Sequence, residues 1–173
     1  MANTKHTWIV DPTHSEVRFK VKHMMISTVS GDFTEFEASV KTEEDNFINA
    51  DFNFSAKIDS IHTKNKDRDA HLRSADFFDA ENYPEMKFQS KSFDGDTLIG
   101  DLTIKDTTKE IELDVDFNGV AQDPYGNTKA GFEISGAISR KDFGLNWNAV
   151  TEAGSIVVSD KVRLNIDLQF VKK

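Results

Sequence analysis

Apolar and polar residues alternate with a period of two along much of this 173-residue chain. From Val162 to Phe170, five apolar side chains fall on one face and four polar side chains on the other. Successive side chains of a β-strand point to opposite faces, so this pattern predicts a strand with one buried face and one solvated face. Strands of a parallel sheet, which are buried on both faces, would instead have continuous apolar runs. The same alternation predicts strands at residues 17–21, 52–58 and 111–117.

Less regular runs predict further strands, for a total of about eight, at residues 29–41, 85–93, 97–105 and 129–140. In the first of these runs the apolar phase changes between Phe33 and Phe36, which indicates a β-bulge. Polar and glycine-containing segments at 94–96 and 123–127 predict hairpin turns.

Two segments depart from the alternation. Residues 65–74 are mostly charged and contain neither Gly nor Pro, so they predict one short helix. Residues 141–159 are irregular. Because there is little helix to cover an open sheet, the buried faces of the strands must pack in a sandwich or close into a barrel. Periodicity alone does not separate these two architectures, but both are all-β and antiparallel, and the length of the chain predicts a single domain over 1–173.

The composition narrows the classes of function. The formal net charge is −9 and no run of Lys or Arg occurs, which argues against nucleic acid or an anionic membrane as the partner. The absence of Cys excludes disulfides, thiol catalysis and thiolate metal sites. No stretch approaches the roughly 20 apolar residues that span a bilayer, so stable membrane insertion is not expected. Fourteen of the eighteen aromatic residues are Phe, which fills an interior without a polar atom to satisfy.

The N-terminal residues contain no apolar core of a secretion signal, which predicts a cytoplasmic protein. A chain from which a leader had been removed would look the same, and such a chain would point to the periplasm.

Few residues carry an obvious chemistry. The five histidines lack the spacing of a local metal motif, so neither a metal nor a cofactor is expected. His23 shares the inward phase of the preceding strand, where it would bond to backbone or contact a ligand. Asp67 and His71 would lie side by side on the helix, most simply as a solvated pair. Arg140 continues an inward phase, where it would pair with Asp142 or meet an anionic head group.

Several motifs in a fixed order resemble those of the YceI-like, polyisoprenoid-binding family. The opening Asp11-Pro12-Thr13-His14-Ser15 leads to His23 and then to Gly31-Asp32-Phe33. The central segment 69–79 is followed by Tyr83-Pro84 and by Phe88. Later segments at 100–104 and 140–145 complete a match that runs from Trp8 to about Phe170.

The resemblance implies a lipocalin-like barrel of eight antiparallel strands that holds a long apolar lipid, an isoprenoid or a related chain, inside. It also suggests a homodimer. The ligand-binding residues would be interior apolar side chains and polar side chains at the mouth. The candidates are Phe19, Val21, His23, Phe33, Phe36, Phe54, His71, Phe77, Phe88, Phe132, Ile134, Arg140, Phe143 and Trp147.

Two other functions stay open at this point. The chain could be an enzyme that acts on an apolar substrate, with His14, His23, His71 and carboxylates as acid and base at the mouth. It could instead be a stress-related or interaction protein whose barrel is filled by its own side chains. The volume of the interior cavity distinguishes a barrel filled by its own side chains from a lipid carrier.

Overall fold

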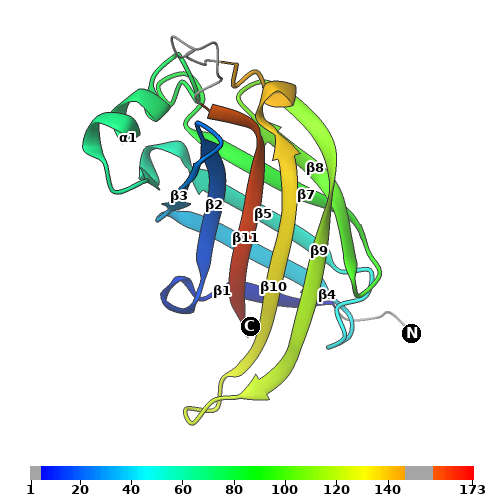
Figure 1. Ribbon diagram of the computed structural model, residues 1–173. Coiled ribbons are helices and arrows are strands. Elements are labelled where there is room, and N and C mark those ends of the chain that lie inside the picture. The colour runs from blue at the N-terminus through cyan, green and yellow to red at the C-terminus, as the bar shows by residue number, and fades with distance from the viewer. Residues whose placement is uncertain (1–4, 147–157) are drawn as a thin grey trace.

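The computed structural model describes residues 5–146 and 158–173 of the chain. In this part of the chain eleven strands form one antiparallel sheet that closes on itself (Figure 1). The strands are β1 (His6–Val10), β2 (Glu16–His23), β3 (Ser27–Phe33), β4 (Phe36–Thr42), β5 (Asp51–Lys57), β6 (Ile61–His62), β7 (Glu85–Phe93), β8 (Thr97–Ile104), β9 (Thr107–Gln122), β10 (Thr128–Ser139) and β11 (Val158–Lys172). The helical elements are η1 (Pro12–His14), η2 (Ile58–Ser60), α1 (Lys66–Arg73) and η3 (Arg140–Phe143).

The closed ring runs β1-β4-β5-β7-β8-β9-β10-β11 and returns to β1, so the described residues form a barrel of eight strands. The strands β2, β3 and β6 continue this ring at one end of the barrel. There β2 pairs with β11 and β3, and β3 pairs with β6. Each of β1/β2, β3/β4 and β5/β6 is therefore one long strand of the barrel that is broken in the middle. The all-β antiparallel barrel expected from the sequence is confirmed.

The breaks explain where the sequence pattern becomes irregular. The strand expected over 29–41 is two strands, β3 and β4, separated by Thr34 and Glu35. Thr34 and Glu35 leave the ladder of the barrel. The backbone N–H of Thr34 donates to the carbonyl of Ser60, and the carbonyl of Glu35 accepts from Lys57. The phase change between Phe33 and Phe36 is thus a bend of the chain that keeps both rings directed inward.

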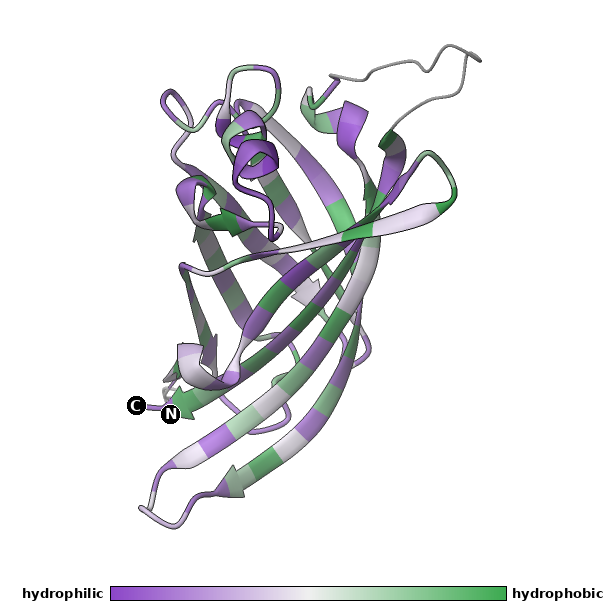
Figure 2. Ribbon diagram, turned by 60° about the vertical axis from the view of Figure 1, so that its left-hand side comes forward, coloured by the Kyte–Doolittle hydropathy of each residue, from purple (hydrophilic) through white to green (hydrophobic). Residues whose placement is uncertain are grey.

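The alternation along each strand matches the two faces of the barrel, as the banding of purple and green in Figure 2 shows. In β10, for example, Ala130, Phe132 and Ile134 are buried, whereas Glu133 and Ser135 are exposed. Helix α1 begins after Asn65, whose side chain caps it by accepting from the backbone N–H of Arg68. The helix expected over 65–74 is confirmed.

Aromatic rings fill the end of the barrel away from α1. The centre of the cluster is Phe132, whose ring centroid lies 4.9 Å from that of Phe117 and 5.0 Å from that of Phe47. Phe47 belongs to the loop between β4 and β5 and adopts a left-handed backbone conformation, with φ of 63°. This conformation is unfavourable for a bulky residue, and here it directs the ring into the barrel, where Phe47 is fully buried against Trp8. A side chain from a loop thereby closes this end.

We predict that Phe132→Ala destabilises the protein by about 3–5 kcal/mol, because it leaves a cavity among rings that cannot collapse together. The neighbouring Glu133→Ala, which removes an exposed side chain from the outer face of β10, should change the free energy of unfolding by less than about 0.5 kcal/mol. Urea unfolding measures both values. Equal losses in the two variants would contradict the assignment of inner and outer faces.

Candidate functional site

An apolar cavity of about 120 Å³ lies inside the barrel. Its lining comes from β2, β3, β4, β5, β7, β8, β9, β10 and β11, so the cavity follows the barrel interior rather than a gap between two elements. All of its 22 lining residues except Arg18 and Asn53 are apolar. A cavity with this lining stays dry and selects a guest by shape and apolarity, because it offers no directional polar contact.

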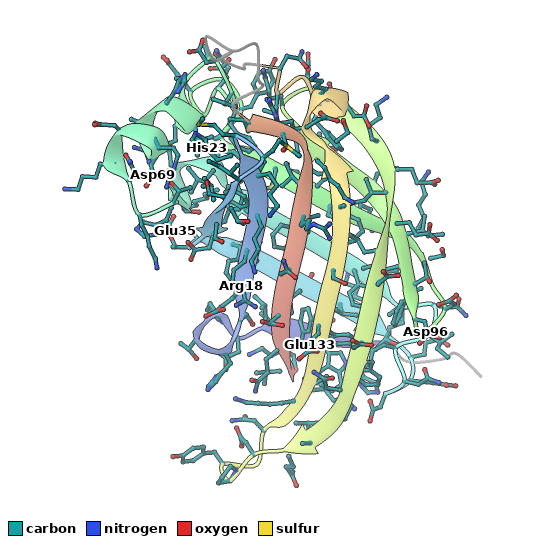
Figure 3. All side chains as sticks on the ribbon, in the orientation of Figure 1. Arg18, His23, Glu35, Asp69, Asp96 and Glu133 are labelled. Atoms are coloured by element: carbon teal, nitrogen blue, oxygen red, sulfur yellow. The ribbon has the colours of Figure 1, made fainter. Side chains whose placement is uncertain are left out.

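A second cavity of about 490 Å³ lies at the mouth of the barrel, between α1 and the ends of β2 and β3. Its walls are mixed. Val21, Val29 and Phe77 supply apolar surface, whereas His23 and His71 supply polar groups. In Figure 3 the labelled His23 lies at the upper end of β2 beside α1, which carries Asp69. This arrangement suits a ligand with an apolar tail and a polar end.

Helix α1 is held over the mouth by a buried polar network. The carboxylate of Asp69 accepts hydrogen bonds from the backbone N–H of Thr63 at 2.9 Å and from its hydroxyl at 2.5 Å. Arg68 donates from Nε to the Thr63 hydroxyl and from Nη2 to the Thr63 carbonyl. Because these partners satisfy the buried carboxylate of Asp69, its role is to position the helix.

Phe19 separates the two cavities and lines both of them. Its ring packs against Phe33 with a centroid distance of 5.7 Å and lies over Gly31 of the neighbouring strand. A Cβ atom at Gly31 would lie only 2.4 Å from the ring of Phe19, so glycine is what allows the ring to lie flat there. Among the described residues, Phe19 is the one that lines both the interior and the mouth cavity.

The structure brings most of the predicted ligand-binding residues to a cavity. The interior cavity is lined by Phe19, Phe33, Phe54, Phe88 and Ile134. The mouth cavity is lined by Phe19, Val21, His23, His71 and Phe77. Phe36 lines a separate, wide hollow of about 940 Å³, together with mostly polar residues of β4, β5, β7 and β8. Trp147 lies outside the described residues.

The remaining predicted residues have packing roles in the described part of the chain. Phe132 belongs to the aromatic cluster that fills the far end of the barrel. Phe143 is the last residue of η3 and is buried in the core. Neither is among the residues that line the interior or the mouth cavity. An inward phase places a side chain within the barrel, but whether that side chain borders empty space depends on how its neighbours pack.

Arg140 differs from its expectation. Its guanidinium donates to the backbone carbonyls of Leu145, Ser159 and Val158, at 2.6, 2.9 and 3.1 Å. Among the described residues it forms no ion pair with Asp142, because η3 leaves Asp142 exposed while it buries Arg140. Burial lowers the pKa of Arg140 and the nearby Asp160 raises it. Arg140 therefore ties η3 to the start of β11.

The histidines do not form one catalytic group. His23 and His71 share the mouth cavity, and His71 Nε2 lies 2.8 Å from a carboxylate oxygen of Asp76 rather than pairing with its helix neighbour Asp67. His14 lies in η1, where its Nδ1 is 2.9 Å from Asp11. Within residues 5–146 and 158–173, no cluster of three His, Asp or Glu side chains could hold a metal ion. No helix of these residues is long and apolar enough to cross a bilayer.

The opening motif builds the corner between β1 and β2. The Asp11 carboxylate accepts from the hydroxyl of Thr13 at 2.6 Å and from the Nζ of Lys129 at 3.3 Å. The backbone carbonyl of Asp11 accepts from the hydroxyl of Ser15. These contacts, with the hydrogen bond to Thr13 the largest cause and that to His14 the next, hold the pKa of Asp11 well below its usual range. The motif therefore fixes the barrel corner, and none of residues 11–15 lines the interior or the mouth cavity.

Sequence reasoning missed part of the cavity lining and one side chain that closes the barrel. The first is the aliphatic lining, such as Leu102, Ile111 and Leu164, which has the same inward phase as the predicted phenylalanines. Period two alone could have identified these residues. The second is Phe47, whose loop reads as a solvated acidic segment, so no local pattern indicates that its ring enters the barrel.

The chain is similar to proteins of one family along nearly its whole length. A sequence model described as the YceI-like domain matches residues 8–170. A UPF0312 protein of Staphylococcus epidermidis is 37% identical over 161 residues, which cover 92% of this chain and 94% of that protein. The crystal structure of a Campylobacter jejuni YCEI protein is 34% identical, with a TM-score of 0.73 over 88% of this chain and 90% of that one.

A more distant structure has the same fold. It is a polyisoprenoid binding domain from Saccharophagus degradans implicated in plant cell wall breakdown, with a TM-score of 0.69 at 13% identity. The match covers 96% of this chain and 98% of that domain.

We predict that Asp11→Asn lowers the free energy of unfolding by about 1–3 kcal/mol at pH 7, because it removes a charge that accepts several hydrogen bonds. A carboxyl group with a lowered folded-state pKa stabilises the fold above its unfolded pKa of about 3.9, and this stability is lost as pH falls below that value. The gap between wild type and variant should therefore narrow below about pH 4 in urea titrations. A gap that widens in acid would contradict this, and the exposed Asp106→Asn serves as control.

Proposed function

Because this chain belongs to the YceI-like family, we propose that it binds the apolar chain of a lipid inside its barrel without catalysing a reaction on it. The observation that carries the proposal is the apolar cavity inside the barrel, which Phe19 separates from a mouth cavity with apolar and polar walls. A barrel filled by its own side chains would have no such interior space.

The volumes indicate how a chain would be placed. An apolar cavity of about 150 Å³ holds a molecule as small as benzene. The interior cavity of about 120 Å³ therefore accepts only the end of a long chain in the present arrangement of side chains. The rest of the chain would occupy the mouth cavity of about 490 Å³, and the ring of Phe19 would have to turn aside to let it pass.

The energetics support binding by burial alone. Each methylene group removed from water contributes roughly 0.8 kcal/mol, so about ten buried groups contribute on the order of 8 kcal/mol before the costs of association. The dry lining adds no penalty for polar groups left unpaired. Discrimination among ligands would come from the mouth, where His23 and the His71–Asp76 pair can meet a polar end.

The relatives favour the same class of ligand. The Saccharophagus degradans domain, which shares this barrel, is a polyisoprenoid binding domain. An isoprenoid is a long, flexible hydrocarbon, so it fits a narrow apolar cavity that widens only at the mouth. The enzyme alternative has less support in the geometry, because His14 bonds to Asp11 at the barrel corner while His23 and His71 lie at the mouth.

The first test is uptake of apolar chains by the purified protein. After extraction with organic solvent, we expect a fluorescent prenyl or acyl chain to bind, with affinity that rises with chain length and then levels off. Ile111→Trp places a larger side chain in the interior cavity and should lower the affinity by about tenfold or more, because it displaces the end of the chain. Glu112→Trp, at the adjacent exposed position, should leave the affinity unchanged. No uptake by the wild-type protein, or equal effects of the two variants, would refute the proposal.

Phe19→Ala tests the passage between the cavities. Removal of the ring should destabilise the empty protein by about 3–5 kcal/mol, and the enlarged space should extend the chain length at which affinity levels off. Thermal unfolding and the same uptake titration measure the two effects. If the variant loses stability while its preferred chain length stays the same, Phe19 is a packing residue only.

A further inference from the structure

The hairpin that joins β2 to β3 carries an apolar tip at the rim of the mouth cavity. Met24, Met25 and Ile26 are 40%, 71% and 82% exposed. Met24 and Met25 both have left-handed backbone conformations, with φ of 52° and 61°. A hairpin turn of this kind favours Asn or Gly, which tolerate positive φ. All three apolar side chains are unfavourable in water because they are exposed, and Met24 and Met25 are unfavourable also because of their backbone conformation.

The outer surface behind this tip is basic, although the whole chain has a net charge of −9. Lys20 and Lys22 of β2 and Lys161 and Arg163 of β11 are exposed. Lys20 lies directly opposite Arg163 in the ladder. Like charges in this position are destabilising, and no ion pair within the described residues involves any of these four side chains. We call Lys20, Lys22, Lys161 and Arg163 the basic patch.

The basic patch contrasts with the other half of the same two strands. Further from the tip, Arg18 of β2 pairs with Glu16 and with Asp167 of β11, which is the usual arrangement on a strand surface. Figure 3 labels His23 at the tip end of β2 and Arg18 in its lower half. The one acidic residue of β11 near the basic patch, Asp160, accepts hydrogen bonds from Ser139 and from the backbone of Lys141.

The neighbouring strands leave the basic patch open. Thr28 and Ser30 of β3 lie opposite Lys22 and Lys20, and Ala137 of β10 lies opposite Arg163. None of these directly opposite residues is acidic. The four cations of the patch outnumber the two carboxylates at its border, Asp32 and Asp160, so the local charge is positive within the Debye length of about 8–10 Å at physiological ionic strength. Over that distance the local cations act on a partner more strongly than the distant acidic residues that set the net charge.

We propose that the apolar tip and the basic patch together dock on an anionic lipid surface and bring the mouth of the barrel to it. At about 3.3 Å per residue, Lys22 and Lys20 lie roughly 7 and 13 Å behind Met24 along β2. A tip inserted at the boundary between head groups and acyl chains would therefore place Lys22 and its neighbour Lys161 among the head groups, with Lys20 and Arg163 at the level of the surface. Lys22 and His23 also line the mouth cavity, so docking would set its opening against the lipids.

Apolar insertion and cationic attraction are two signals that reinforce each other at an anionic membrane. A nucleic acid or an acidic protein would use the basic patch but would gain nothing from Met25 and Ile26. The combination therefore favours a lipid surface. The docking itself does not depend on a bound ligand. That a docked protein would take up or release a lipid chain through its mouth rests on the proposed function.

The test is flotation of the purified protein with vesicles of phosphatidylcholine containing about 30% phosphatidylglycerol, compared with vesicles of phosphatidylcholine alone. We expect the protein to bind the anionic vesicles and to bind the neutral vesicles only weakly. High salt should abolish binding to the anionic vesicles. The double variant Lys20→Gln/Arg163→Gln should lower the partition coefficient by about tenfold or more. Met25→Ser/Ile26→Ser should lower it as strongly, because the apolar anchor is removed.

Matched variants control for charge and for exposed apolar surface. Lys41→Gln/Lys109→Gln removes the same charge from exposed positions on β4 and β9, and Tyr125→Ser removes a residue that is 89% exposed in the hairpin between β9 and β10. Neither should change vesicle binding, and thermal melts should show that all variants are folded.

Absence of vesicle binding, equal binding to both kinds of vesicle, or equal effects of the test and control variants would overturn the docking proposal. So would salt-sensitive binding to heparin that Met25→Ser/Ile26→Ser leaves unchanged while vesicles are not bound, because it would indicate a soluble polyanion as the partner. Uptake of the fluorescent chain from solution, measured on the same variants, should be unaffected. A failure of docking is thereby distinguished from a failure of chain binding.

Discussion

Pairing of β1 with β11 closes the sheet, and the interior cavity depends on that closure. Trp8 lies opposite Lys172 and Val10 opposite Phe170, so the first and last described strands complete the ring of hydrogen bonds. Without this pairing the inner faces of the strands would need a second layer to cover them, and packing against that layer would remove the interior space. Closure also leaves the eight positions of the ring without a free edge. The corner at Asp11, which turns β1 into β2, allows one stretch of chain to pair with β11 along both of its halves.

The two ends of the barrel are packed by different kinds of side chain, and this difference places the cavity. At the far end, Phe132 is stacked on Phe117 and meets Phe47, Phe52 and Phe170 edge to face, at centroid distances of 4.9–5.7 Å. Rings arranged in this way fill space efficiently. Toward α1 aliphatic side chains such as Ile138, Val162 and Leu164 share the interior with the rings of Phe19 and Phe33, and the space left between them is the cavity of about 120 Å³. A fold with one closed and one accessible end follows from where the large rings are placed along the strands.

The sequence predicted the elements well because the determinants of a strand are local. The run at 129–140 predicted β10 to within one residue at each end, and the charged segment 65–74, which lacks Gly and Pro, predicted α1. What escaped prediction depends on contacts between distant residues. Arg140 has the inward phase of a mouth residue, but its partners are carbonyls of Leu145, Val158 and Ser159, which no spacing in the sequence indicates. Phe47 belongs to an acidic loop, and it is buried because its ring packs against Trp8 and Phe132, which are distant in the sequence.

Charge shows the same limit of sequence reasoning. A net charge of −9 is a property of composition, and it correctly describes the field far from the protein. Close to the surface, strand pairing decides which charges meet. The register of β2 on β11 brings Arg18 to Asp167 near one end and Lys20 to Arg163 only two residues further along. A shift of the register by two residues would place Lys22 opposite Arg163, or Lys20 opposite Lys161, so cations would still face each other and charge pairing does not select the register. The inward residues Val17, Phe19 and Val21 fix the register by their packing in the barrel. This register then sets Lys20 opposite Arg163 on the outer surface, although the two cations repel each other.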